Sequence, residues 1–337
     1  MSLVPRLEAY LAGRIGAPVR VSNFGRKSGG ASRETYLFDA SWSDGSSEKT
    51  QAYVLRRDPV ASLLESDRTH EFRVLEGAAR LGLPVPRVSW LELDRAPLDR
   101  PFFIMERVEG FPTPPTFPAA YPEEMRARVA ADFVDILARI HGADWRVLGF
   151  DFLDDPGVGL HAARRAVALW RGVYEQDRIE AHPILTRAFS WLDRLLPATD
   201  RVTIVHGDYR TGNYLHDAAG HITAMLDWEM THLGDPIEDL GWATMPYWYC
   251  EDRACGLERE ADMVRRYEGA TRTAVAPERL RFYQVLGTVK MMAISLTGVR
   301  NYCEGRSAEP TLAVVGFLTG RLMRELAVLL GLGEARG

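Results

Sequence analysis

The spacing of hydrophobic positions changes about a third of the way along the chain. Before residue 110, short apolar runs of β type are separated by polar or glycine-bearing turns, at residues 19–24, 35–40, 52–56 and 100–108. Two stretches in this part, residues 1–17 and 66–81, instead have apolar side chains at helical spacing. The pattern predicts a small β-rich unit that carries two helices.

Helical spacing dominates after a proline-dense segment at residues 111–118, which can form neither a helix nor an interior strand. Apolar side chains from Val129 to Ile140 line one face of a helix that begins near Pro122. Further helices are predicted at residues 160–176, 184–195, 258–267, 277–303 and 311–330, with β-runs at 202–205 and 222–226. We therefore expect an α+β protein of two lobes, residues 1–110 and residues 111–337.

Composition narrows the classes of partner. The 337 residues are 46% hydrophobic and 26% charged, with a net charge of −5 and no long basic run, which argues against nucleic acid or an anionic membrane as the main partner. The three cysteines, Cys250, Cys255 and Cys303, form neither a disulfide framework nor a zinc-binding pattern. No signal peptide or membrane-spanning run is present, so we expect a soluble cytoplasmic protein of undetermined oligomeric state.

The chemistry is concentrated in two short motifs, Val205–Asn213 and Leu226–Glu229. They supply Asp208, Asn213 five positions later, and Asp227 at the end of an apolar run. A kinase needs one carboxylate beside the attacking hydroxyl, and an amide and a carboxylate that hold Mg²⁺ on the ATP phosphates. Asp208 is thus the candidate base, and Asn213 and Asp227 are the candidate metal ligands.

Three neighbouring residues have secondary roles in this hypothesis. Arg210 follows Asp208 by two positions, where its guanidinium would neutralise charge on the transferred phosphoryl group. Glu229 lies two residues after Asp227 and on extended backbone would point the same way, as a metal ligand or as a partner of one. His206 is expected to brace the loop by hydrogen bonding. The competing interpretation makes Asp208 a turn residue and Asp227 a strand-end cap.

These motifs carry a resemblance to a known family. Val205–Asn213, Leu226–Glu229 and Gly234–Leu240 resemble the motifs of the aminoglycoside phosphotransferase-like family, the small-molecule branch of the protein-kinase-like fold. The stretch Ile140–Trp145, which is followed by Leu148-Gly149, is similar to the subgroup found beside or fused to acyl-CoA dehydrogenases. The resemblance covers residues 20–330 and implies a bilobal protein-kinase-like fold that uses ATP and Mg²⁺.

The same resemblance implies a nucleotide site in the first lobe. Ser28-Gly29-Gly30-Ala31-Ser32 would be the loop that covers the phosphates, although a plain hairpin turn explains it equally well. The basic residue of the third strand is Arg56, or else Arg57, where most kinases have lysine. Glu71 matches its acidic partner, the alternative being a solvated helix charge. Glu106 to Val108 would be the hinge whose backbone meets the adenine edge. Asp235 and Asp239 would serve the architecture of the catalytic loop.

The motifs fit two functions. The first is a kinase that transfers the γ-phosphoryl group of ATP to a hydroxyl of a small molecule; the second is a nucleotide-binding pseudokinase with a regulatory role. Because Asp208, Asn213 and Asp227 are all present, the enzyme is favoured. Protein substrates are disfavoured because the chain has no Asp-Phe-Gly and because the interval from Asp227 to Asp235 is too short for a long activation segment.

The phosphate acceptor is less constrained than the reaction. The subgroup suggests a hydroxyacyl-CoA or a hydroxy acid, and the family name suggests an aminoglycoside-like compound. We expect the acceptor pocket between the second-lobe helices and the catalytic loop. Candidate walls are Trp170, Trp242, Tyr247 and Trp248, which as aromatic residues would equally suit a core.

Overall fold

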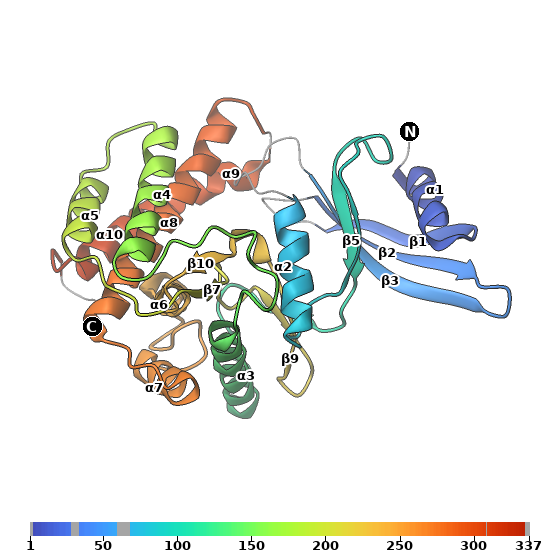
Figure 1. Ribbon diagram of the computed structural model, residues 1–337. Helices are drawn as coiled ribbons and strands as arrows, with labels where there is room; N and C mark the ends of the chain where they lie inside the picture. Colours follow the sequence, from blue (N-terminus) through green and yellow to red (C-terminus); the bar gives the residue numbers. More distant parts are fainter. Residues whose placement is uncertain (1–2, 28–33, 59–67, 308, 334–337) are drawn as a thin grey trace.

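A five-stranded antiparallel sheet forms the first lobe of the computed structural model (Figure 1), which describes residues 3–27, 34–58, 68–307 and 309–333. Its strand order is β1-β2-β3-β5-β4. The bounds are β1 Val19–Lys27, β2 Glu34–Ser43, β3 Glu48–Arg57, β4 Val88–Glu92 and β5 Phe102–Glu106. Strand β4 was not predicted, and its five residues include no fully buried side chain that would have produced an apolar run.

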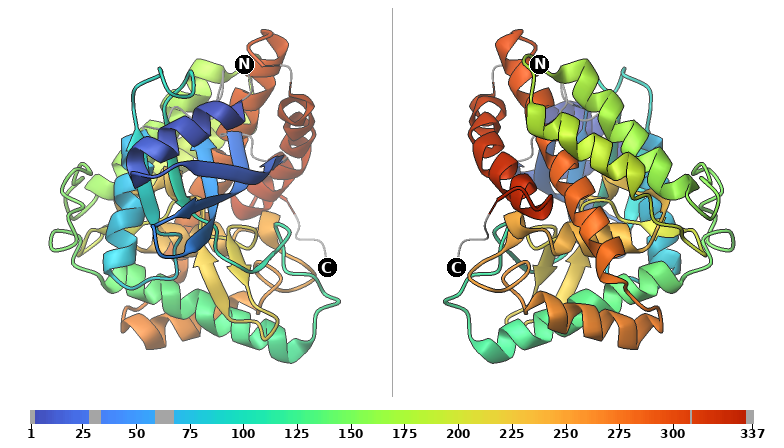
Figure 2. Two further views of the ribbon diagram at one scale, coloured as in Figure 1. Left: turned by 90° about the vertical axis from the view of Figure 1, so that its right-hand side faces the viewer. Right: turned by 90° about the vertical axis from the view of Figure 1, so that its left-hand side faces the viewer.

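Each face of this sheet has its own hydrophobic core because side chains alternate along a strand. Tyr53 and Leu55 of β3 face helix α1 (Leu3–Ile15), which contributes Leu7 and Leu11. Val54 faces the opposite way, into the main core that continues through α2 (Arg68–Arg80) into the second lobe. Figure 2 shows α1 lying across the outer face of the strands, so the inner face is the one turned toward the site.

Helices make up most of the second lobe. They are α3 Glu123–Gly142, α4 His161–Asp177, α5 Pro183–Arg194, α6 Ile237–Ala243, α7 Glu260–Thr271, α8 Pro277–Cys303, α9 Pro310–Val314 and α10 Leu318–Leu329. Helix α8 is central: it packs against α4, α5, α6, α9 and α10. Among the described residues, no helix is both long and apolar enough to cross a membrane.

Two small sheets lie between these helices and the first lobe. Strand β10 (His232–Gly234) pairs with β7 (Thr203–Val205), and β8 (Tyr214–His216) lies between β6 (Phe111–Pro112) and β9 (Ile222–Met225). Strand β6, which begins the proline-dense segment, is an edge strand, in agreement with the expectation that this segment has no interior strand. The backbone N–H of Met225 donates to the carbonyl of Pro84 at 2.6 Å, which ties β9 to the first lobe.

Candidate active site

The turn after β7 places the catalytic loop at the junction of β7 and β10. Gly207 has φ of +85°, and a Cβ built there would lie 2.4 Å from the Met230 carbonyl oxygen. A side chain at residue 207 would therefore clash with the opposite segment as well as strain the backbone. Glycine at this position lets the loop pass close to Met230 and present residue 208 at its tip.

Both carboxylate oxygens of Asp208 are held by hydrogen bonds. Oδ1 accepts from Trp242 Nε1 at 2.8 Å and from Arg210 Nε at 2.9 Å, while Oδ2 accepts from Asn213 Nδ2 at 2.6 Å. The side chain is 14% exposed. The carboxylate is thus fixed in orientation while part of its surface stays open to a reactant, which is the arrangement a positioned base requires.

Asn213 and Asp227 are neighbours through the backbone. The N–H of Leu226 donates to the Asn213 carbonyl at 2.8 Å, which brings the end of β9 against the catalytic loop. Asp227 follows with φ of +65°, a left-handed conformation that aspartate tolerates better than most residues. This backbone turn directs the chain into a short 3₁₀ helix, Trp228–Met230, directly after the candidate metal ligand.

The oxygen donors at this point fit a hard divalent cation. The side-chain nitrogen of Asn213, Nδ2, donates to Asp208, so the side-chain oxygen, Oδ1, faces away from that hydrogen bond. Asp227 adds a carboxylate that is one-third exposed. No cluster of three or more His, Cys, Asp or Glu side chains that could hold a metal occurs within the described residues. Mg²⁺ commonly uses one or two protein oxygens together with substrate phosphates and water, so a sparse set is consistent with that ion.

The backbone assumed for Glu229 was wrong. Extended backbone would have aligned its side chain with that of Asp227, but residue 227 is left-handed and Glu229 lies in the 3₁₀ helix. Glu229 instead lines a neighbouring cavity, and its charge acts on Arg56. A direct role on the metal stays a prediction.

Arg56 reaches from the first lobe to the metal-site residues. Its Nη2 lies 3.3 Å from Glu71 Oε1 and 3.4 Å from Asp227 Oδ1. Burial alone would lower the pKa of Arg56, but attraction by Glu71, Asp227 and Glu229 outweighs it and raises the pKa. Arg57 lies on the other face of β3 and is held by Glu34, which identifies Arg56 as the residue that faces the site. Glu71 is buried, so its interpretation as a solvated helix charge is wrong.

Two other parts of the expected nucleotide site are less defined. The loop Ser28-Gly29-Gly30-Ala31-Ser32 lies outside the described residues. Glu106 ends β5 and binds the Arg87 backbone N–H through its side chain, at 2.9 Å, and Val108 follows in the segment between β5 and β6. Their contact with adenine stays a prediction.

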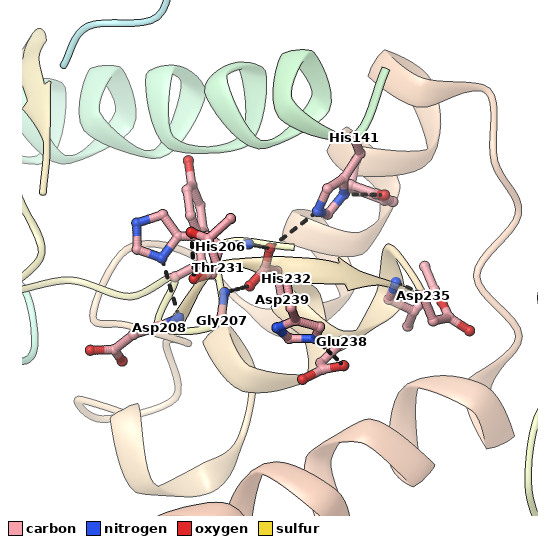
Figure 3. A network of polar contacts seen from close by, with 12 residues as sticks. His141, His206, Gly207, Asp208, Thr231, His232, Asp235, Glu238 and Asp239 are labelled. Carbon is pink, nitrogen blue, oxygen red and sulfur yellow. Dashed lines mark hydrogen bonds and ion pairs between the residues drawn. The ribbon is translucent and has the colours of Figure 1, made fainter. Parts of the chain in front are cut away.

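A buried carboxylate anchors the backbone of the catalytic loop (Figure 3). Asp239 of α6 accepts from the N–H of His206 at 2.7 Å and from that of Gly207 at 2.9 Å, and His141 Nε2 lies 3.2 Å from the same carboxylate. Burial alone would raise the pKa of Asp239, but the hydrogen bonds and charge of His141 outweigh it and the pKa is lowered. The architectural role predicted for Asp239 is confirmed. Within the Ile140–Trp145 motif, His141 is the residue that contacts Asp239.

His206 connects the loop to the end of β9. Its Nδ1 accepts from the Asp208 N–H at 3.2 Å, so the proton resides on Nε2, which lies 3.1 Å from the Leu226 carbonyl oxygen. Burial lowers the pKa of His206 and keeps the ring neutral. The expected bracing role is confirmed. Asp235 is likewise structural, since it holds the Ile237 N–H and forms an ion pair with Arg279 of α8.

A cavity of about 450 Å³ lies beside the catalytic loop. Helix α4, residues 229–234 and helix α8 form its walls. Lys290 of α8, which is 3% exposed, belongs to this wall, and its ammonium group donates to the Gly207 carbonyl next to Asp208. The cavity is thus connected to the catalytic loop through Lys290, although none of residues 205–213 lines it. Its use as an acceptor pocket stays a prediction.

The aromatic residues proposed as walls have different positions. Trp170 lines the cavity, whereas Trp242, Tyr247 and Trp248 are not among its lining residues. Trp242 instead holds Asp208, and Trp248 lies beneath the guanidinium of Arg210, 4.7 Å from ring centroid to Cζ. Sequence reasoning missed Lys290; the signal was a single lysine inside the largely apolar run Val285–Met292.

The fold and the Asp208, Asn213 and Asp227 set define a bilobal protein of the kinase-like class. The chain belongs to the phosphotransferase enzyme family, because the model of that family matches residues 26–283. The predicted family and its α+β kinase-like fold are thereby confirmed.

Individual relatives support the resemblance to the aminoglycoside phosphotransferase-like family and the resemblance to its subgroup associated with acyl-CoA dehydrogenases. Acyl-CoA dehydrogenase family member 10 of Mus musculus is 31% identical over 250 residues, which cover 72% of this chain and 22% of that protein. The chain thus spans well under half the length of the curated relatives it matches, from 22% of that family member 10 to 37% of acyl-CoA dehydrogenase family member 11 of Mus musculus. A Ralstonia eutropha protein assigned as an aminoglycoside phosphotransferase has a TM-score of 0.76 at 22% identity, covering 98% of this chain and 99% of that one.

A second solved structure shares the fold at greater distance. It is a thermostable mutant of aminoglycoside phosphotransferase APH(4)-Ia in ternary complex with ADP and hygromycin B. Its TM-score is 0.62 at 17% identity, with 98% of this chain and 99% of that chain covered. At this level of identity the similarity establishes the fold.

Proposed function

We propose that the protein is an ATP- and Mg²⁺-dependent phosphotransferase that moves the γ-phosphoryl group to a hydroxyl of a small molecule. The observation that carries this proposal is the Asp208 carboxylate, which is fixed at both oxygens and follows Gly207, whose carbonyl accepts a hydrogen bond from Lys290 in the wall of a cavity of about 450 Å³. Family membership supports phosphoryl transfer as the reaction class.

In this proposal, residues 1–110 bind the nucleotide and residues 111–337 supply the catalytic loop and the acceptor cavity. Arg56, held by Glu71, orients the phosphates, and the loop Ser28–Ala31 covers them through its backbone N–H groups. The backbone between Glu106 and Val108 meets the adenine. Asn213 and Asp227, with Glu229 nearby, would hold Mg²⁺, which when bound would neutralise negative charge on the phosphates.

The chemical step needs alignment of the acceptor more than covalent help from the protein. Asp208 orients the acceptor hydroxyl and accepts its proton, which is typically worth a factor of about 10²–10⁴ in rate. Arg210 is anchored to Asp208 through Nε, which places its positive charge next to the base, where negative charge develops on the phosphoryl group. His206 stays neutral and holds the loop in shape.

A phosphorylation screen tests the proposal. Hydroxyacyl-CoAs, hydroxy acids, aminoglycosides, choline and sugars are incubated separately with Mg·ATP, and products are identified by mass spectrometry. We expect a mass gain of one phosphate on at least one class, absent with Asp208→Asn. Lack of any product together with lack of Mg²⁺-dependent ATP binding would refute the proposal and favour the pseudokinase.

A further inference from the structure

A second groove, of about 590 Å³, lies at the end of the β7–β10 pair that is farther from the catalytic loop. The loop follows β7, whereas Arg201 of the groove precedes that strand. The walls are residues 198–201, residues 271–274 and Arg279, and none of them lines the cavity beside the loop. Arg279 precedes Lys290 by eleven residues on α8, which separates the groove from the loop contact by roughly 16 Å along the helix axis.

Three arginines from separate segments line this groove. Arg201 comes from the chain before β7, Arg272 from the end of α7, and Arg279 from the first turn of α8. Among the described residues of the groove, Asp200 is the only carboxylate, and it is exposed. The groove therefore has an excess of positive charge, although the whole protein carries a net charge of −5. Attraction of an anion to this place would be local and would not come from the overall charge.

The charge of Arg201 and that of Arg272 are not balanced by an ion pair. Within the described part of the chain, neither guanidinium lies at ion-pairing distance from a carboxylate. Arg201 is half-buried, and its Nη2 donates to a neutral group, the Thr273 hydroxyl, at 3.4 Å. Each of these guanidinium groups therefore keeps its positive charge and further N–H donors for a ligand.

The backbone of Arg272 is unusual for an arginine. Its φ is +55°, and its N–H donates to the Glu268 carbonyl at 2.8 Å, which ends α7 with a left-handed residue. Glycine is the usual residue in this conformation at a helix end, because it has no Cβ. Since arginine is less favourable than glycine for this backbone, the long cationic side chain is the feature that needs a reason. A ligand in the groove supplies one.

Arg279 gives the groove a guanidinium of fixed position. Its Nε and Nη2 donate to the Asp235 carboxylate at 3.0 Å and 2.7 Å, and Nη2 also donates to Thr199 Oγ1 at 3.0 Å. These bonds leave Nη1 as the donor for a ligand. The charge of Arg279 is balanced by Asp235, so the uncompensated charge of the groove comes from Arg201 and Arg272.

We propose that this groove is a binding site for a phosphate group, either on a small molecule or as the free ion. Two uncompensated guanidinium groups match the double negative charge of a phosphate, and the third guanidinium adds a preorganised donor. A carboxylate has a single charge and two oxygens, so it would satisfy only part of this set. The groove is separate from the proposed nucleotide and acceptor sites, so the proposal does not depend on which reaction the protein catalyses.

Calorimetric titration of the full chain in Mg²⁺-free buffer of constant ionic strength tests the proposal. The probes are inorganic phosphate, glycerol 3-phosphate and acetate. We expect at least one phosphate probe to bind at least about tenfold more tightly than acetate. Tighter binding of the ester would assign the site to phosphate esters, and tighter binding of inorganic phosphate would assign it to the free ion. Acetate that binds as tightly as both, or no phosphate binding at tens of millimolar, would overturn the proposal.

Two variants locate the binding. Arg272→Gly removes a guanidinium and relieves the left-handed backbone, so phosphate affinity should fall at least about tenfold while the thermal midpoint stays at or above that of the native protein. Arg201→Gln should weaken binding to a similar extent. Arg164→Gln, at an exposed position of α4 outside both cavities, removes the same charge and should keep the full affinity. An affinity that persists in Arg272→Gly and in Arg201→Gln would place the phosphate elsewhere, such as at the proposed nucleotide site, and would refute the assignment of the groove.

Discussion

The indole N–H of Trp242 donates to Asp208 Oδ1 at 2.8 Å, so a residue of the buried helix α6 fixes the side chain at the tip of the catalytic loop. The face of the same indole lies 4.5 Å from the Lys290 ammonium group. Trp242 therefore connects the base with the cavity wall, although it belongs to neither the loop nor the cavity.

Replacement of Trp242 by phenylalanine should lower kcat by about tenfold and leave the KM for ATP within about twofold. The ring that packs against Lys290 is largely kept, while a hydrogen bond to a carboxylate, typically worth about 1.5–3 kcal/mol, is lost. Steady-state kinetics measures both constants. Trp191→Phe, at a half-buried position that stacks on Phe282, is the matched control. Unchanged kcat would show that Trp242 does not orient Asp208.

Asp208→Asn should reduce turnover by at least about a hundredfold while ATP binding stays largely intact. The amide preserves the size of the side chain but cannot accept the hydroxyl proton. Turnover and nucleotide binding are measured separately, by ADP release and by calorimetry. Asp193→Asn, on an exposed side chain of α5, provides the control. Full turnover in Asp208→Asn would remove this residue from the role of base.

Asp227→Asn should weaken Mg·ATP binding and raise the Mg²⁺ concentration needed for half-maximal activity. Asparagine tolerates the left-handed backbone at φ of +65°, whereas alanine would add strain of about 1 kcal/mol, so this variant isolates the lost charge. Titration of Mg²⁺ at saturating ATP gives the half-maximal concentration. An Mg²⁺ dependence identical to that of the native protein would refute the assignment of Asp227 as a metal ligand.

Asp239→Asn should lower the free energy of unfolding by about 2–4 kcal/mol, because two backbone N–H groups and His141 lose a buried anionic acceptor. Urea denaturation measures this loss. The exposed carboxylate of Asp252 is suited to a control, as Asp252→Asn, which should change stability by less than about 0.5 kcal/mol. A comparably small change for Asp239→Asn would contradict the anchoring role.

Acidification below about pH 6.5 should destabilise the protein through His206. Burial lowers the pKa of His206 in the folded state, so below the ordinary value of about 6.5 the unfolded chain binds a proton that the folded chain does not. Stability is therefore lost as the pH falls from about 6.5 toward the folded-state pKa, by up to about 1.4 kcal/mol per unit of pKa difference.

The pH dependence of the thermal midpoint, measured for the native protein and for His206→Gln, isolates this contribution. His232 acts in the opposite direction: burial lowers its pKa, but Glu238 outweighs burial and raises it. His232 contributes stability at low pH that is lost as the pH rises through its folded-state pKa. The His206 contribution is thus the difference between the two curves. If the thermal midpoints of the native protein and of His206→Gln fell equally steeply below about pH 6.5, the contribution of His206 would be disproved.

The sequence predicted the strongly patterned elements and missed those without a pattern. The long amphipathic helix at residues 123–142 was visible because its buried side chains recur at helical spacing. All seven residues of α6 are buried, so this helix has no polar face to mark its period. Strands β4, β8 and β10 have three to five residues each and are too short to show clear alternation.

The site residues that could be predicted are those whose role follows from residue type and from spacing along the chain. Asp208, Asn213 and Asp227 lie together as expected because the loop and the turn after β9 are joined by short backbone contacts. The backbone of Glu229 was mispredicted because the left-handed turn at Asp227 has no signal beyond the aspartate itself. Lys290 and His141 were not assigned because tertiary packing alone brings helices α8 and α3 to the loop.

Helix α8 forms one long wall of the cavity. Lys290, Thr297 and Asn301 line the cavity from this single helix, and the first and last are eleven residues apart. At about 1.5 Å per residue, they span roughly 16 Å along the helix axis. Bulk added at Thr297 would divide that span, and a one-turn change in the register of α8 would alter it by about 5.4 Å. The distance between the two ends of this wall is thus set by a single helix, separately from the chemistry at the loop.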